Sequence, residues 1–164
     1  MTLASLSQLL AYAADLGAEL ERYAVTLVSP SEDEIVISKG ASGSLELALH
    51  GRLPDSRRAS PADLVLRERW HPAGDGLYAR VEYVHELRHH GLGYRRAFHR
   101  HDEDQFARTF GVLTHEHCEA VMGSPTCRHY FGEPVRDAFD AFRRLYLVWL
   151  SGEAPDCAAL RCLG

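Results

Sequence analysis

Two His-x-His pairs, His99/His101 and His115/His117, are the residues in this chain whose type and spacing best suit chemistry. Side chains of a β-strand alternate between its two faces, so residues two apart point the same way. If both segments are strands and they lie side by side, four imidazoles converge on one face of a sheet. Glu119 would share that face. The sequence therefore predicts a functional site within residues 94–119.

General acid–base catalysis is one use of such a cluster. Histidine titrates near neutral pH and can both give and take a proton. A pair of such groups beside arginines can cleave an RNA phosphodiester through its own 2′-hydroxyl, with the arginines neutralising the phosphate. The candidate catalytic residues are His99, His101, His115, His117, Arg95 and Arg96.

Metal binding is the second use of the same residues. Three histidines, or two histidines and a carboxylate, bind zinc, iron or manganese and leave coordination positions open. The cofactor is not specified by the pattern, but zinc or another divalent transition metal fits it. The candidate ligands are His99, His101, His115, His117, Glu119, Cys118 and Cys127.

A structural zinc site and a purely structural role remain open beside these two. Histidines and the cysteines Cys118 and Cys127 stand close together in the sequence, but the Cys-x-x-Cys spacing typical of zinc ribbons is missing. Each cysteine could equally be a buried thiol, and Cys157 and Cys162 could pack on a helix. The histidines outside the two pairs are typical of ordinary strand and turn positions.

The elements that would position the cluster follow from hydrophobic periodicity. Leucines at helical spacing predict an amphipathic helix over residues 3–20, which Thr2 or Ser5 could cap, and the pattern of residues 135–150 predicts a long C-terminal helix. Between them, alternating patterns predict strands near residues 44–53, 64–71, 77–87, 94–101 and 112–119, with a turn at residues 71–76, a hairpin loop at residues 88–93 and a short helix at residues 102–111. We expect a single α+β domain over residues 1–164: a mostly antiparallel, curved sheet of about five to six strands with both helices packed on it.

Composition narrows the class of protein. The chain has 164 residues, 46% of them hydrophobic, which is enough for a core without metals or disulfides. A net charge of −5 argues against a protein that coats nucleic acid by bulk electrostatics. The N-terminus lacks a basic region and no apolar run reaches 18 residues, so we expect no membrane span and a cytoplasmic location. The cysteines should then be reduced thiols or metal ligands and not disulfides.

The strand–turn–strand sequence VEYVHELRHHGLGYRRAFHRHD, followed by THEHCE, resembles small prokaryotic proteins of the TumE type. The resemblance covers residues 77–119. Those proteins are proposed toxins of toxin–antitoxin pairs, so the resemblance implies an RNA-directed toxin held in check by an antitoxin-like protein partner. It carries over to Arg96, His99, His101, His115 and His117. This chain departs from the pattern in its acidic HEHCE segment, its long C-terminal helix and its cysteine-bearing tail.

Overall fold

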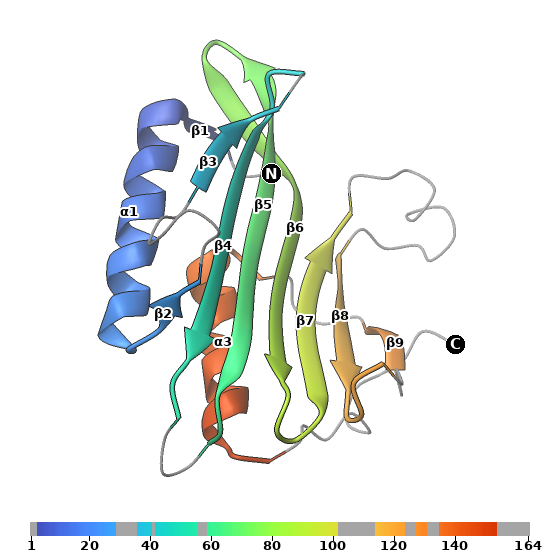
Figure 1. Cartoon of the computed structure of the whole chain (residues 1–164). Helices are drawn as coiled ribbons and strands as arrows, with labels where there is room; N and C mark the ends of the chain where they lie inside the picture. Colours follow the sequence, from blue (N-terminus) through green and yellow to red (C-terminus); the bar gives the residue numbers. More distant parts are fainter. Residues whose placement is uncertain are drawn as a thin grey trace.

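A computed structural model describes residues 3–28, 36–40, 42–55, 59–101, 114–123, 127–130 and 135–153 of the chain. Within these ranges the chain forms two helices and nine strands (Figure 1). In chain order they are β1 (Leu3–Ser5), α1 (Leu6–Arg22), β2 (Thr26–Leu27), β3 (Val36–Lys39), β4 (Leu45–Leu53), β5 (Ala62–Gly74), β6 (Leu77–His89), β7 (Tyr94–Arg100), β8 (Thr114–Glu119), β9 (Cys127–Tyr130) and α3 (Ala138–Leu150). The expected α+β class is confirmed. The helix expected at residues 102–111 and the C-terminal tail lie outside the described residues.

All nine strands belong to one antiparallel sheet. Its continuous path is β2-β4-β5-β6-β7-β8-β9, while β1 pairs with β6 and β3 pairs with β4. The strands expected near residues 44–119 correspond to β4 to β8, the longer members. The other strands, β1, β2, β3 and β9, span only two to four residues. Segments this short show too little alternation to be recognised as strands.

Both helices pack on the same face of the sheet. Helix α1 begins at a capping box in which Ser5 and Gln8 exchange hydrogen bonds, and it buries Leu9, Ala13, Leu16 and Leu20. Helix α3 begins at the cap Asp137, whose side chain accepts from the Asp140 backbone N–H. Their apolar stripes join alternate residues of β4 to β7 in one core cluster, which includes Leu49, Leu66, Leu87, Phe98 and Phe142. Among the described residues, no helix combines the length and the apolar character that crossing a membrane requires.

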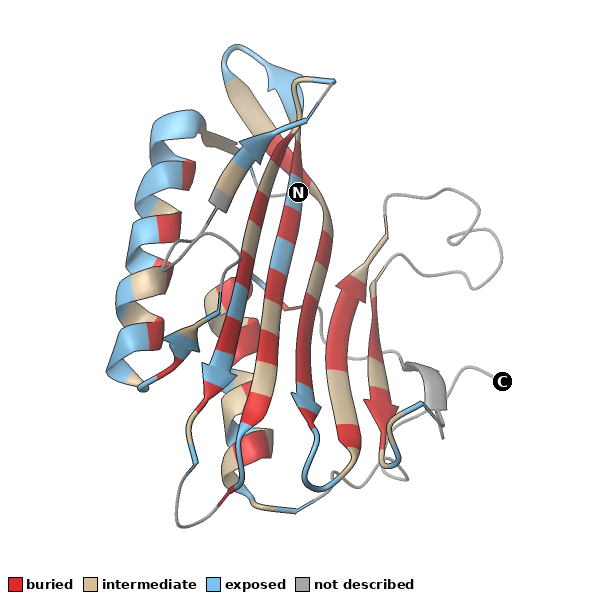
Figure 2. Ribbon diagram, in the orientation of Figure 1, coloured by how far each residue is buried: buried red, intermediate tan, exposed pale blue. Residues whose placement is uncertain are grey.

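The sheet therefore has an inner face, which the helices cover, and an outer face on the opposite side. The outer face is formed by the alternate residues of β4 to β8 (Figure 2). These residues are Glu46, Ala48, His50, Arg52, Asp63, Val65, Arg67, Arg69, Glu82, Val84, Glu86, Arg88, Arg95, Ala97, His99, His115, His117 and Glu119.

The turn predicted at residues 71–76 is shorter than expected. Strand β5 continues through His71–Gly74, and only Asp75 and Gly76 lie between it and β6. Both residues have positive φ, 51° and 71°, which is the geometry of a two-residue hairpin turn and the reason for the Asp-Gly dipeptide. Pro72 is tolerated because the strand register shifts between Pro72 and Gly74.

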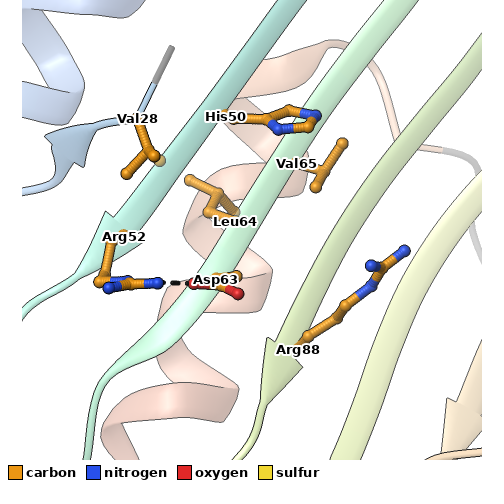
Figure 3. Close-up of a pocket in the computed structure, with 8 residues that line it drawn as sticks. Val28, His50, Arg52, Asp63, Leu64, Val65 and Arg88 are labelled. Carbon is orange, nitrogen blue, oxygen red and sulfur yellow. Dashed lines mark hydrogen bonds and ion pairs between the residues drawn. The ribbon is translucent and has the colours of Figure 1, made fainter. Parts of the chain in front are cut away.

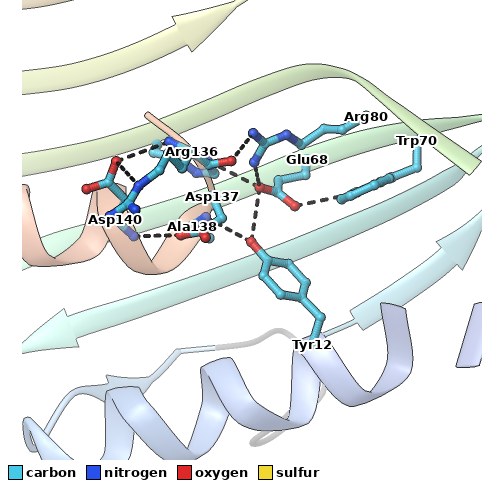
Figure 4. Close-up of polar contacts among 9 residues, drawn as sticks. Tyr12, Glu68, Trp70, Arg80, Arg136, Asp137, Ala138 and Asp140 are labelled. Carbon is cyan, nitrogen blue, oxygen red and sulfur yellow. Dashed lines mark hydrogen bonds and ion pairs between the residues drawn. The ribbon is translucent and has the colours of Figure 1, made fainter. Parts of the chain in front are cut away.

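A buried carboxylate, Glu68, ties both helices to the inner face (Figure 4). Its Oε1 accepts hydrogen bonds from Arg80 Nη1 at 2.6 Å and from the Tyr12 hydroxyl at 3.2 Å, and its Oε2 accepts from Trp70 Nε1 at 3.3 Å. The Tyr12 hydroxyl in turn accepts from the backbone N–H of Ala138 at 2.8 Å, the first residue of α3. A register shift between Arg69 and Trp70 turns Arg80 toward this inner network, although strict alternation over residues 77–87 would place Arg80 on the exposed face.

Candidate metal centre

The strand register brings the two His-x-His pairs together. Strands β7 and β8 are neighbours, with His99 directly opposite His115 and Ala97 opposite His117. His99 and His115 point to the outer face, since the residues that alternate with His99, Tyr94 and Phe98 among them, belong to the inner core. The expected convergence of the two pairs is confirmed.

The four imidazoles form one compact cluster. Ligand nitrogens of His99, His101 and His115 all lie within 4.8 Å of one another. Nε2 of His115 and Nε2 of His117 are 2.9 Å apart, a hydrogen-bond distance, and the ring centroids of His99 and His117 are 4.7 Å apart. Zinc with Zn–N distances of about 2.0–2.1 Å needs ligand nitrogens roughly 3.3–3.4 Å apart in a tetrahedron. The ligand nitrogens therefore lie slightly farther apart than around a bound zinc ion. Side-chain rotations that move the nitrogens by about an ångström would bring them to zinc-binding distance.

The environment of the cluster favours neutral imidazoles. The exposed fractions of His99 and His115 are only 7% and 5%, and His101 and His117 are half-buried. Burial lowers the pKa of His99 to about 2, helped by the neighbouring imidazoles and Arg95. Metal binding requires the neutral imidazole, so His99 is already in the form that coordinates a metal ion.

His99 also has an unsatisfied polar atom. Its Nε2 is buried and, among the described residues, has no hydrogen-bond partner. A buried polar atom without a partner is costly, and such atoms call for a specific explanation. Coordination of a metal ion by His99 Nε2 would satisfy it.

Ion pairs border the cluster on the outer face. The Arg95 guanidinium binds Glu86 at 2.5 Å and Glu119 at 2.8 Å. Glu119 also accepts the Gly123 backbone N–H at 2.9 Å. Burial acts to raise the pKa of Glu119, but the hydrogen bonds from Gly123 and Arg95 outweigh it, so the net pKa is lowered. The positive charge of Arg95 and the negative charges of Glu86 and Glu119 therefore largely compensate one another.

The outer face holds two further residues of the predicted site. Arg95, Ala97 and His99 follow one another at every second position of β7, so Arg95 lies on the face of His99, as the catalytic hypothesis requires. Glu119 shares the face of His115 and His117, which confirms its expected orientation. Its carboxylate, however, is bound by Arg95 and Gly123 and is not part of the group of ligand atoms around His99.

Arg96 and Cys118 lie on the inner face, so neither side chain joins the histidine cluster. They stand opposite one another in the β7–β8 register, and Arg96 forms an ion pair with Glu116. Cys118 is fully buried and disulfide-bonded, so it is neither a reduced thiol nor a thiolate ligand. Both are an odd number of positions from the histidines of their strands, and alternation therefore turns them away. The side chain of Cys127 lies outside the described part of the structure.

Glu86 is a neighbour of the site that the sequence did not identify. It is buried on the outer face, bound by Arg88 and Arg95, in the row that also holds Ala97 and His117. The alternating pattern of residues 77–87 does place Glu86 opposite the core. Nothing local in the sequence shows that it pairs with Arg95 of the next strand.

Comparison with known proteins adds no identity to this geometry. The chain matches no protein-family model, no curated protein and no solved structure.

Proposed function

We propose that this protein is a metal-dependent hydrolase of RNA phosphodiesters, and that its histidine cluster binds one divalent transition-metal ion such as zinc. The observation that carries the proposal is the convergence of ligand nitrogens from His99, His101 and His115 within 4.8 Å. Three histidines are the ligand set of catalytic zinc sites that keep a fourth position open.

Each histidine has a role in this proposal. His99, His101 and His115 would hold the ion, and a bound divalent metal would supply Lewis-acid chemistry at a phosphoryl oxygen and an activated water. His117 is half-buried, with its Nε2 at 2.9 Å from Nε2 of His115, and would serve as the proton acceptor. Arg95 contributes positive charge near the cluster, although Glu86 and Glu119 compensate much of it.

RNA is proposed as the substrate on two grounds. The resemblance of residues 77–119 to TumE-type toxins implies RNA, and it also implies an antitoxin-like protein partner, which stays a prediction. Arginines on the outer face, among them Arg52, Arg67, Arg88 and Arg95, accompany the histidines. Metal-free acid–base cleavage would need His101, His115 or His117 as the acid, because burial lowers the pKa of His99 to about 2 and keeps that imidazole neutral.

Elemental analysis of untagged protein, purified without added metal, tests the proposal directly. We expect about one equivalent of metal, its loss in a His115→Ala/His117→Ala variant, and its retention in His50→Ala, a histidine of the same face outside the cluster. Metal-loaded protein should cleave a single-stranded RNA, and the double variant should not. Absence of metal from the native protein would overturn the metal site, and RNA cleavage by that metal-free protein would instead support acid–base catalysis.

A structural zinc site is the second candidate. It is favoured by the burial of His99 and His115 and by the fourth imidazole, which could close the coordination shell. In that case the metal would be needed for folding, and chelation would unfold the protein. A folded, inactive protein in chelator would support the catalytic site instead.

The proposed cytoplasmic location follows from the sequence alone. The disulfide at Cys118 argues in the opposite direction, because disulfides persist mainly in oxidising compartments. Thiol labelling of Cys118 in protein quenched directly from cells distinguishes the cytoplasm from an oxidising compartment. Labelling without reductant supports the cytoplasm. Labelling only after addition of a reductant contradicts it.

A further inference from the structure

A small pocket lies on the outer face, on the strands that precede the histidine cluster. It has a volume of about 150 Å³ and is lined mainly by Val28, His50, Arg52, Asp63, Val65 and Arg88 (Figure 3). Drug-sized ligands occupy pockets of roughly 300–1,000 Å³, so this one suits a single small group and not a whole nucleotide cofactor.

Two guanidiniums, those of Arg52 and Arg88, line the pocket together with the imidazole of His50 and one carboxylate, Asp63. Arg52 binds Asp63 through Nε at 3.2 Å, and Arg88 binds Glu86 also through Nε. Within the described part of the chain these bonds leave the terminal nitrogens of both arginines available. Guanidinium forks of this kind recognise phosphate groups.

The pocket and the histidine cluster lie on the same face of the sheet. Strand pairing aligns Arg52, Asp63, Arg88, Arg95 and Glu119 across β4 to β8, and His50, Val65, Glu86, Ala97 and His117 form the next row. The pocket therefore spans β4 to β6, and Arg88 is two strand spacings of about 4.8 Å, or roughly 10 Å, from β8. The ion pairs of Glu86 with Arg88 and Arg95 lie between the pocket and the histidines.

We infer that the Arg52/Arg88 pocket is a phosphate subsite. It would hold one phosphate of a nucleic-acid strand that runs across β4 to β8, with another phosphate at the histidine cluster. The inference deepens the proposed function and rests on it for the position of the reacting phosphate. Aromatic residues are missing from the described outer-face positions of β4 to β8, so base stacking contributes little there. Recognition through phosphate predicts binding that is independent of sequence and weakened by salt.

Binding of a fluorescently labelled 12-nucleotide RNA to metal-depleted protein, followed by anisotropy, tests the subsite without cleavage. We expect Arg52→Ala/Arg88→Ala to weaken binding at least tenfold and to flatten its salt dependence. The matched control is Arg143→Ala. Arg143 lies on α3 with the same 59% side-chain exposure as Arg52, and its ion pair with Glu19 spans 3.1 Å, close to the 3.2 Å of Arg52 with Asp63. The control should bind within twofold of the native protein.

Asp63→Asn is a test in which RNA binding should become tighter. A variant that merely fails to fold cannot give this result. Removal of the carboxylate frees Arg52 and lowers the negative charge of the pocket, so RNA binding should tighten several-fold. Binding by Asp63→Asn that is unchanged or weaker would overturn the subsite, as would equal losses in the double variant and the Arg143→Ala control.

The outcomes also separate the subsite from the proposed function. RNA binding that depends on Arg52 and Arg88, in a protein that holds no metal and cleaves no RNA, supports the subsite and refutes the hydrolase. Metal-dependent cleavage with unaltered binding in the double variant supports the hydrolase and refutes the subsite. DNA of the same sequence should show the same dependence on the two arginines, and a dependence confined to RNA would contradict recognition through phosphate.

Discussion

At the scale of single residues, the buried imidazoles of the outer face are the most informative groups in the chain. His115 is opposite His99 in the strand register and within hydrogen-bond distance of His117, so it is central to the proposed ligand set. We expect His115→Ala to weaken zinc binding at least tenfold, since it removes one of three ligands and opens the site to water. Isothermal titration with Zn²⁺ measures this. The control His50→Ala should bind zinc like the native chain, and equal affinities in all three would contradict the assignment.

The pKa of His99 predicts how stability depends on pH in metal-free protein. The unfolded chain binds a proton at this residue below about pH 6.5, but the native chain does so only near pH 2. The unfolded state therefore binds more protons in this window, and the free energy of unfolding falls as the pH falls. From pH 7 to pH 5 the loss is about 2 kcal/mol. Urea denaturation in chelator at pH 7 and pH 5 measures this loss. In His99→Phe, which cannot titrate, the free energy of unfolding should fall by about 2 kcal/mol less over the same range. The same pH dependence of the free energy of unfolding in the variant and the native chain would refute the explanation.

At the scale of secondary-structure elements, Glu68 joins α1, α3 and the sheet through Tyr12 and Arg80. We expect Glu68→Gln to lower the free energy of unfolding by about 3–5 kcal/mol, because Arg80 would remain buried without its counter-charge. Glu46→Gln breaks an exposed pair with Arg67 on the same sheet and should cost less than about 1 kcal/mol. Chemical denaturation of both variants measures the difference. Similar losses in the two would show that the inner network does not hold the elements together.

The alternation of β7 predicts opposite consequences for two adjacent arginines. Arg96 faces the helices and pairs with the buried Glu116, whereas Arg95 lies on the face of the histidines. Arg96→Gln should therefore destabilise the fold by about 2–4 kcal/mol, yet leave zinc affinity within twofold of the native chain. Denaturation and zinc titration of the same sample give both values. A loss of zinc affinity without a loss of stability would contradict the register of β7.

At the scale of the whole molecule, the two faces of the sheet have separate tasks. The core lies between the inner face and the two helices (Figures 1 and 2). The histidine cluster lies on the outer face, together with arginines such as Arg52, Arg67 and Arg95. Removal of metal should therefore leave a folded protein that unfolds cooperatively. The free energy of unfolding should fall only by the amount that metal binding to the native state had added. This is about 2.7 kcal/mol if metal was present at 100 times its Kd. Circular dichroism and thermal unfolding in chelator measure this, and a chain that unfolds on chelation would favour the structural zinc site.

The sequence by itself determined the elements that have a strong local period. Helical spacing of leucines predicted α1, whose cap proved to be Ser5, and the apolar stripe of residues 135–150 predicted α3. Alternation predicted β4, β6 and β7, and the His-x-His spacing predicted that each pair shares a face. These features depend only on residues a few positions apart, so the local sequence contains all that decides them.

Only the tertiary structure decided which distant residues meet. The pairing of His99 with His115 depends on the register of two strands separated by residues 101–113, a choice that neither strand makes alone. A register shift beside Trp70 also turned Arg80 inward to Glu68. A change of register by one residue moves every side chain to the opposite face, and burial of the core across the whole sheet selects the register. Site geometry is therefore a property of the packed sheet.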